Sequence, residues 1–74
     1  MYTVEILKLK EKYIVDIEDA FKDRDDITTE VHPSIEPGLS YITISNIHTV
    51  TMTPLMWWIL HHIDKSDYYQ IIIS

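Results

Sequence analysis

The sequence predicts a small α+β domain in which an antiparallel sheet of about four to five strands packs against one or two helices. Segments rich in Val, Ile, Tyr and Thr recur along the chain and are typical of strands. One run of large apolar residues, 55–60, is typical of a buried helix. The only glycine, Gly38, lies beside two prolines in the stretch 32–38, which predicts a turn between two halves of the chain.

The N-terminal stretch fits two structures. A hairpin with strands 2–7 and 12–17 and a loop at 8–11 brings apolar side chains onto one face, pairing Ile6 with Tyr13, Val4 with Val15 and Tyr2 with Ile17. A helix instead forms an apolar stripe of Tyr13, Ile14, Ile17, Ala20 and Phe21. Strand-forming residue types favour the hairpin, followed by a short helix near 18–25, although its turn has neither glycine nor asparagine.

The middle of the chain predicts further strands. A short strand covers 27–32 and runs into Pro33. Alternating apolar residues at 40–45 and 49–52 predict either a second hairpin, with a loop at 46–48, or one long bent strand.

The C-terminal third predicts a helix and then a strand. Thr53 followed by Pro54 is a favourable helix start, with Thr as the N-cap and Pro at the first helical position, and the helix extends to about Asp64. The last strand covers 68–73. Its isoleucines at 71–73 are apolar on both faces, which predicts a central place in the sheet.

Length and charge limit the classes of function. The chain of 74 residues is expected to form a single domain, 1–74, and the absence of cysteine excludes disulfides and thiolate zinc sites. The net charge of −6 opposes direct binding to nucleic acid or to anionic membranes, and it favours a protein partner with a basic surface. The longest nearly apolar stretch, 52–63, is too short to span a bilayer, and the N-terminus has no secretion-signal pattern. We therefore expect a cytoplasmic location, which is the host cytoplasm if the protein is viral.

The charge lies mainly in the first half of the chain. Residues 1–36 carry 10 acidic and 5 basic side chains, net −5, whereas residues 37–74 carry two acidic and one basic, net −1. The acidic residues crowd the segment 16–30, as Asp16, Glu18, Asp19, Asp23, Asp25, Asp26 and Glu30. In one continuous helix they would be about 3 Å apart, close to the phosphate spacing of a DNA strand. The segment therefore fits a nucleic-acid mimic that binds a basic groove, or else a solvated surface paired with Lys22 and Arg24.

The helix predicted at 53–64 is apolar on all sides. A domain of this size cannot easily enclose such a helix completely, so part of it should face a second surface. Tryptophan and methionine are enriched at the centres of interfaces. We expect either a partner-binding or dimer surface, or else additional core, made of Trp57, Trp58, Leu60 and His61.

No residue pattern points to catalysis, a metal ion or a cofactor. The acids at 19–26 lack the glycine and the final glutamate of an EF-hand loop. His61 and His62 are neighbours on a helix and cannot chelate one ion together, so they better suit the helix C-terminus. A single glycine excludes phosphate-binding loops and nucleophile elbows, and the lack of cysteine excludes thiol catalysis.

These features predict a non-catalytic protein-binding module. In style it is similar to small phage or mobile-element proteins that inhibit a host factor. The leading hypothesis is an inhibitor of a host nucleic-acid-binding protein or complex. The alternative is a homo-oligomer or complex subunit that assembles through the helix 53–64, and a small enzyme or ligand-binding domain ranks last.

Overall fold

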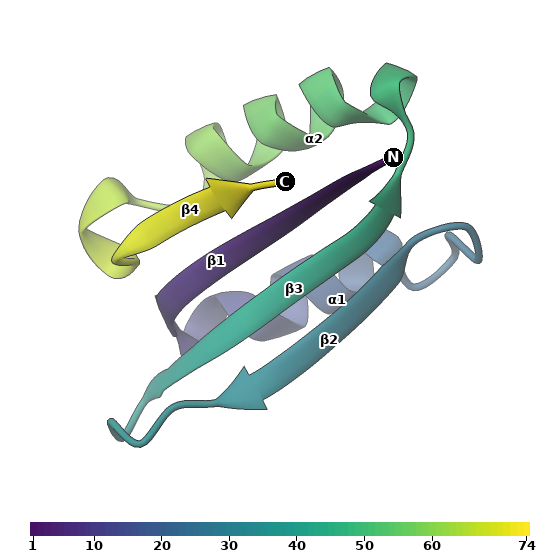
Figure 1. The fold of residues 1–74 in the computed structure, drawn as a ribbon. Helices are drawn as coiled ribbons and strands as arrows, with labels where there is room; N and C mark the ends of the chain where they lie inside the picture. Colours follow the sequence, from purple (N-terminus) through teal and green to yellow (C-terminus); the bar gives the residue numbers. More distant parts are fainter.

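The computed structural model describes all 74 residues and places two helices on one face of a four-stranded antiparallel sheet (Figure 1). The elements follow in the order β1 (Tyr2–Lys10), α1 (Ile14–Phe21), β2 (Thr28–Pro33), β3 (Leu39–Ile47), α2 (Thr49–His62) and β4 (Gln70–Ile73). Two short 3-10 turns, η1 (Glu11–Tyr13) and η2 (Lys65–Asp67), precede α1 and β4. The strand order β2-β3-β1-β4 is the split βαβ, or ferredoxin-like, topology. The predicted α+β class, with a small antiparallel sheet against helices, is confirmed.

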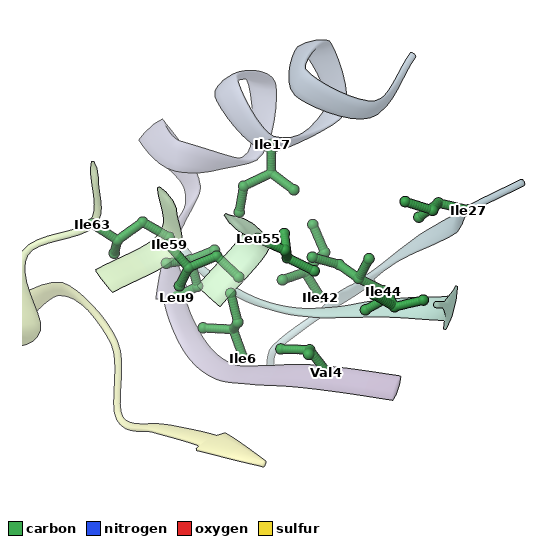
Figure 2. Packing of buried hydrophobic residues seen from close by; sticks show 11 residues of the cluster. Val4, Ile6, Leu9, Ile17, Ile27, Ile42, Ile44, Leu55, Ile59 and Ile63 are labelled. Carbon is green, nitrogen blue, oxygen red and sulfur yellow. The ribbon is translucent and has the colours of Figure 1, made fainter. Parts of the chain in front are cut away.

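The core lies between the sheet and the two helices (Figure 2). The central strands contribute Val4, Ile6 and Leu9 from β1 and Ile42, Ile44 and Ile47 from β3, none of which has exposed surface. The helices and loops complete the cluster with Ile17, Ile27, Leu55, Ile59 and Ile63. Every buried hydrophobic residue is aliphatic, and the aromatic rings lie at the margin of the core or outside it.

Each central strand contains a bulge. Between the pairs Ile6–Ile42 and Leu9–Ser40, β1 advances three residues while β3 advances two. Near the other end of the pair of strands, β3 has the extra residue instead. Lys8 (φ 52°) and Asn46 (φ 62°) lie in these two intervals and have left-handed backbone conformations. Each bulge resets the alternation, and Leu9 and Ile47 therefore return to the core face.

The predicted N-terminal hairpin is wrong, and the helical alternative is correct. Residues 2–10 form one strand that pairs with β3 and β4, and the helix covers 14–21 rather than 18–25. The apolar stripe that includes Ile14, Ile17 and Phe21 packs against the core. Val4 and Ile6 find partners in Ile44 and Ile42, far along the chain, so local pairing with 12–17 is not needed.

The predicted strand at 49–52 is also wrong. The helix α2 begins at Thr49 after His48, so Thr53 is not its N-cap and Pro54 lies inside it. The alternation of Val50 and Met52 therefore has no structural meaning, because Val50 is exposed while Met52 packs against the core from the first turn of the helix. Neither a hairpin nor one long bent strand follows β3.

The last strand, β4, is an edge strand and not the predicted central one. It pairs only with β1, and Ile72 and Ile73 are 39% and 49% exposed. Ile71 lies opposite Ile6 on the helix-covered face, whereas Ile72 lies opposite Glu5 on the uncovered face. An apolar residue on each face of a strand therefore did not indicate burial between two neighbouring strands.

Candidate protein-binding surfaces

The outward side of α2 displays apolar side chains. The helix buries Leu55 and Ile59 against the sheet, and its opposite side carries Val50 and Trp57, which are 84% and 63% exposed. These two residues and His61 recur at helical spacing on one stripe. We call this stripe, made of Val50, Trp57 and His61, the α2 ridge. Leu60, which is 55% exposed, lies on the flank of the ridge.

Contacts within the helix hold Trp57 in one orientation. Its indole stacks on the His61 ring with the ring centroids 4.2 Å apart and the planes inclined by 22°. His61 Nδ1 lies 2.7 Å from the Trp57 carbonyl oxygen and donates a hydrogen bond to it, because a carbonyl can only accept. An exposed aromatic side chain that is already ordered loses less conformational entropy when a partner covers it.

Trp58 belongs to a different environment. It is half-buried against the core and stacks on His62, with a centroid separation of 4.6 Å. His62 Nε2 lies 3.0 Å from Asp16 Oδ2, which joins the end of α2 to the start of α1. The structure therefore separates two tryptophans that the sequence grouped together: Trp57 is displayed with Leu60 and His61, and Trp58 packs between the helices.

The acidic segment does not form the continuous helix that even spacing would need. The helix α1 ends at Phe21, and the segment continues through a loop into β2. Glu30 lies opposite Thr43, on the face of the sheet that no helix covers. Its carboxylate is therefore separated from those of α1 by the thickness of the sheet.

Several of the acids have local partners. Arg24 donates two hydrogen bonds to Asp26, both of 3.0 Å, and this interaction lowers the pKa of Asp26 and raises that of Arg24. Asp16 is bound to His62, and Glu30 lies 3.4 Å from His32. Within the segment 16–30, four carboxylates make no ion pair, those of Glu18, Asp19, Asp23 and Asp25, and all four residues are exposed.

A buried carboxylate that sequence reasoning missed connects the two halves of the fold. The Tyr13 hydroxyl donates to Asp67 Oδ2 at 2.6 Å, and Lys10 Nζ lies 3.0 Å from Oδ1. Lys12 Nζ lies 3.5 Å from Oδ2. The hydrogen bond from Tyr13, followed by that from Lys10, lowers the pKa of Asp67 to about 2. Because Tyr13 and Asp67 are 54 residues apart, no local pattern could have indicated the pair.

The surface has only shallow hollows, each of about 300 Å³. One lies beside Asp67 and is lined by Lys8, Lys10, Ser66 and Tyr69. Another lies between the helices, where Phe21, Leu55 and Trp58 meet. No three Asp, Glu or His side chains lie close enough together to hold a metal ion. The three hollows are open to solvent rather than enclosed.

Similarity to known proteins does not indicate a function for this chain, so the α2 ridge and the acidic segment are the features from which a function can be argued. Neither α2 nor α1 combines the length and hydropathy that a bilayer-spanning helix requires. The split βαβ topology hosts many unrelated functions and does not by itself indicate one. Searches against protein families, curated proteins and solved structures find no match to this chain.

Proposed function

We propose that the chain is a non-catalytic protein-binding module whose partner binds the α2 ridge. The observation that supports this most strongly is the exposure of Trp57, 63%, in a domain whose buried core is aliphatic throughout. Exposed tryptophans are costly in solution and are enriched among the residues that dominate binding energy in interfaces. Folding does not account for this side chain, and binding a partner does.

The neighbourhood of the ridge indicates the chemistry of the partner. From Thr49 to Leu60 the helix carries no charged side chain, so the contact itself is apolar. The chain as a whole has a net charge of −6. A partner with an apolar groove and a basic surrounding surface fits both features, because its charge would speed association while the groove supplies the affinity.

A second candidate uses the acidic segment. The carboxylates of Glu18, Asp19, Asp23 and Asp25 are exposed and without ion-pair partners, which favours contact with a basic protein surface. In this version the chain inhibits a nucleic-acid-binding protein of its host by occupying the phosphate-binding groove. The division of the segment between a short helix, a loop and the far face of the sheet reduces the number of acids that can act together.

One capture experiment tests both candidates. The chain is immobilised, incubated with extract of the cells in which it naturally occurs, and washed at about 0.15 M and about 1 M NaCl, where the Debye length falls to roughly 3 Å. Four proteins are compared: wild type, Trp57→Ala, Val15→Ala, and a variant in which Glu18, Asp19, Asp23 and Asp25 carry amides instead. Val15 is the matched control because it is 61% exposed on α1.

The two candidates predict opposite patterns. Binding through the ridge survives about 1 M NaCl and is kept by Val15→Ala and by the variant with four amides, but it is lost in Trp57→Ala. Binding through charge is lost at high salt and in the variant with four amides, and it is kept by Trp57→Ala. If wild type and the three variants capture the same proteins at both salt concentrations, neither surface is the binding site.

A further inference from the structure

The edge strand β4 has backbone groups that no other strand occupies. Thr3 and Ser74 exchange hydrogen bonds of 2.8 and 2.9 Å, so the N–H and C=O of Ser74 point toward β1. Because these groups alternate along an antiparallel strand, those of Ile72 also point toward β1, where it lies opposite Glu5. The N–H and C=O of Ile71 and Ile73 therefore point away from the sheet and are free to pair with another strand.

The two edges of the sheet differ in how they are protected. The other edge strand, β2, carries Glu30, His32 and Pro33, and charged residues and proline are the usual means by which edge strands avoid pairing with other chains. The strand β4 has neither, since Gln70–Ile73 contains no charged residue and no proline. An unprotected apolar edge is suited to receiving a strand.

Apolar side chains flank this edge. Ile71 and Ile73 lie on the helix-covered face, opposite Ile6 and Val4, and Ile73 is 49% exposed. The side of α2 that carries Pro54 and Trp58 meets α1. Leu60, on the opposite side of the helix, faces away from α1 toward the β4 edge. Both the strand and the flank of the helix therefore offer apolar contact to whatever pairs with β4.

We infer that this chain forms a dimer in which β4 pairs antiparallel with β4 of a second copy. A two-fold axis at Ile72 satisfies the free groups, because Ile71 of each copy then exchanges hydrogen bonds with Ile73 of the other. The two Ile72 side chains face each other on the uncovered face. The two Leu60 side chains approach on the helical face, so the sheets join into one and the α2 helices become neighbours.

The charge distribution limits where two copies of this chain can meet, and the uncharged strand Gln70–Ile73 satisfies that limit. Each chain has a net charge of −6, and most surfaces would therefore repel their counterparts. The acidic loop between α1 and β2 lies at the β2 side of the sheet, the edge farthest from β4. Joining the β4 edges keeps the acidic loops of the two copies as far apart as this sheet allows. The inference is independent of the proposed function, because the ridge residues Val50, Trp57 and His61 stay exposed in the dimer.

The test measures mass in solution by sedimentation over a ~100-fold range of concentration. Wild type is expected to sediment at twice the mass of the chain, and Ile72→Lys at the mass of one chain, because it places two like charges at the axis. Ile35→Lys is the matched control: it makes the same change at a fully exposed loop residue and is expected to remain dimeric. Trp57→Ala is also expected to remain dimeric, which separates this interface from the ridge.

A second measurement does not depend on a substitution. The amide protons of Ile71 and Ile73 should exchange slowly at concentrations where the dimer forms and at least tenfold faster on dilution, whereas the Ile72 amide stays protected by β1 throughout. The inference is overturned if wild type is monomeric at every concentration or if the Ile71 and Ile73 amides exchange freely in the dimer. A dimer that is lost in Trp57→Ala and kept in Ile72→Lys would place the contact on the outward side of α2 instead.

Discussion

The two helices cover the same face of the sheet and differ almost completely on the sides that face solvent. Towards the core α1 contributes Ile17 and α2 contributes Ile59, and both side chains are fully buried. Outward, α1 presents carboxylates such as Glu18, whereas α2 presents Trp57 and no charge. Because the demands of burial are alike, the fold does not explain the difference. The apolar composition of the outward side of α2 therefore has a cause other than folding.

The largest expected effect tests whether the inward sides are equivalent. Ile59→Ala and Ile17→Ala should each lower the free energy of unfolding by about 2–5 kcal/mol, because each leaves a cavity in the core. For a domain of this size the total is roughly 4–11 kcal/mol, so either variant would lose a large share of its stability. Urea titration of the two variants measures the losses. A loss below about 1 kcal/mol for Ile17→Ala would show that α1 contributes little to the core.

A smaller effect should distinguish the adjacent tryptophans. Trp58→Ala is expected to lower the free energy of unfolding by about 2 kcal/mol, because it removes a half-buried ring that packs against the core. Trp57→Ala should change it by no more than about 0.5 kcal/mol, because that ring is mostly in solvent. The same urea titration compares them. Equal losses for the two would contradict the separate environments described above and would weaken the case that Trp57 is free for a partner.

The last effect depends on pH and concerns the contact between Asp67 and the first half of the chain. Folding lowers the pKa of Asp67 from 3.8 to about 2, so the carboxylate stabilises the fold fully above about pH 4 and loses its effect as the pH falls toward 2. Asp67→Asn should therefore have a lower melting temperature than wild type at pH 7, and the difference should disappear near pH 2. Melting temperatures measured from pH 7 to pH 2 test this. A difference that is independent of pH would mean that the charge of Asp67 is unimportant.

Much of the fold follows from residue patterns that are local. The alternation of Ile42 and Ile44, the turn around Gly38 and the short strand before Pro33 all predict elements that the structure contains. The N-terminal half was ambiguous because Tyr13, Ile14 and Ile17 suit a strand by residue type and a helix by spacing. Only the pairing of β1 with β3, a contact between distant segments, decides between them.

The errors in the second half have two causes, neither of which is visible in the local pattern of apolar residues. Val50 and Met52 continue the parity of Ile44, but the bulge at Asn46 breaks that parity before the helix begins. Three consecutive isoleucines in β4 suggest burial, but only the order of strands determines which strand lies at the edge.

For the candidate surfaces, the sequence correctly indicated that α2 could not be buried on all sides. The predicted surface grouped Trp57 with Trp58, whereas the structure places Trp58 on the side of α2 against which α1 packs. The sequence could not show that the acids after Phe21 leave the helix, or that Glu30 lies on the other face of the sheet. These facts follow from tertiary arrangement and have no local signal.

The bulges at Lys8 and Asn46 have a consequence for how this chain can change in length. A bulge bends its strand, and β1 curves past Ile6 toward Leu9 (Figure 2). Removing Lys8 or Asn46 would restore a regular pleat and keep Leu9 or Ile47 on the core face, because the flanking core residues would then be two positions apart. Loss of a single codon should therefore be tolerated at either bulge, whereas loss of Thr43, in the regular part of β3, would put Ile42 and Ile44 on opposite faces of the sheet.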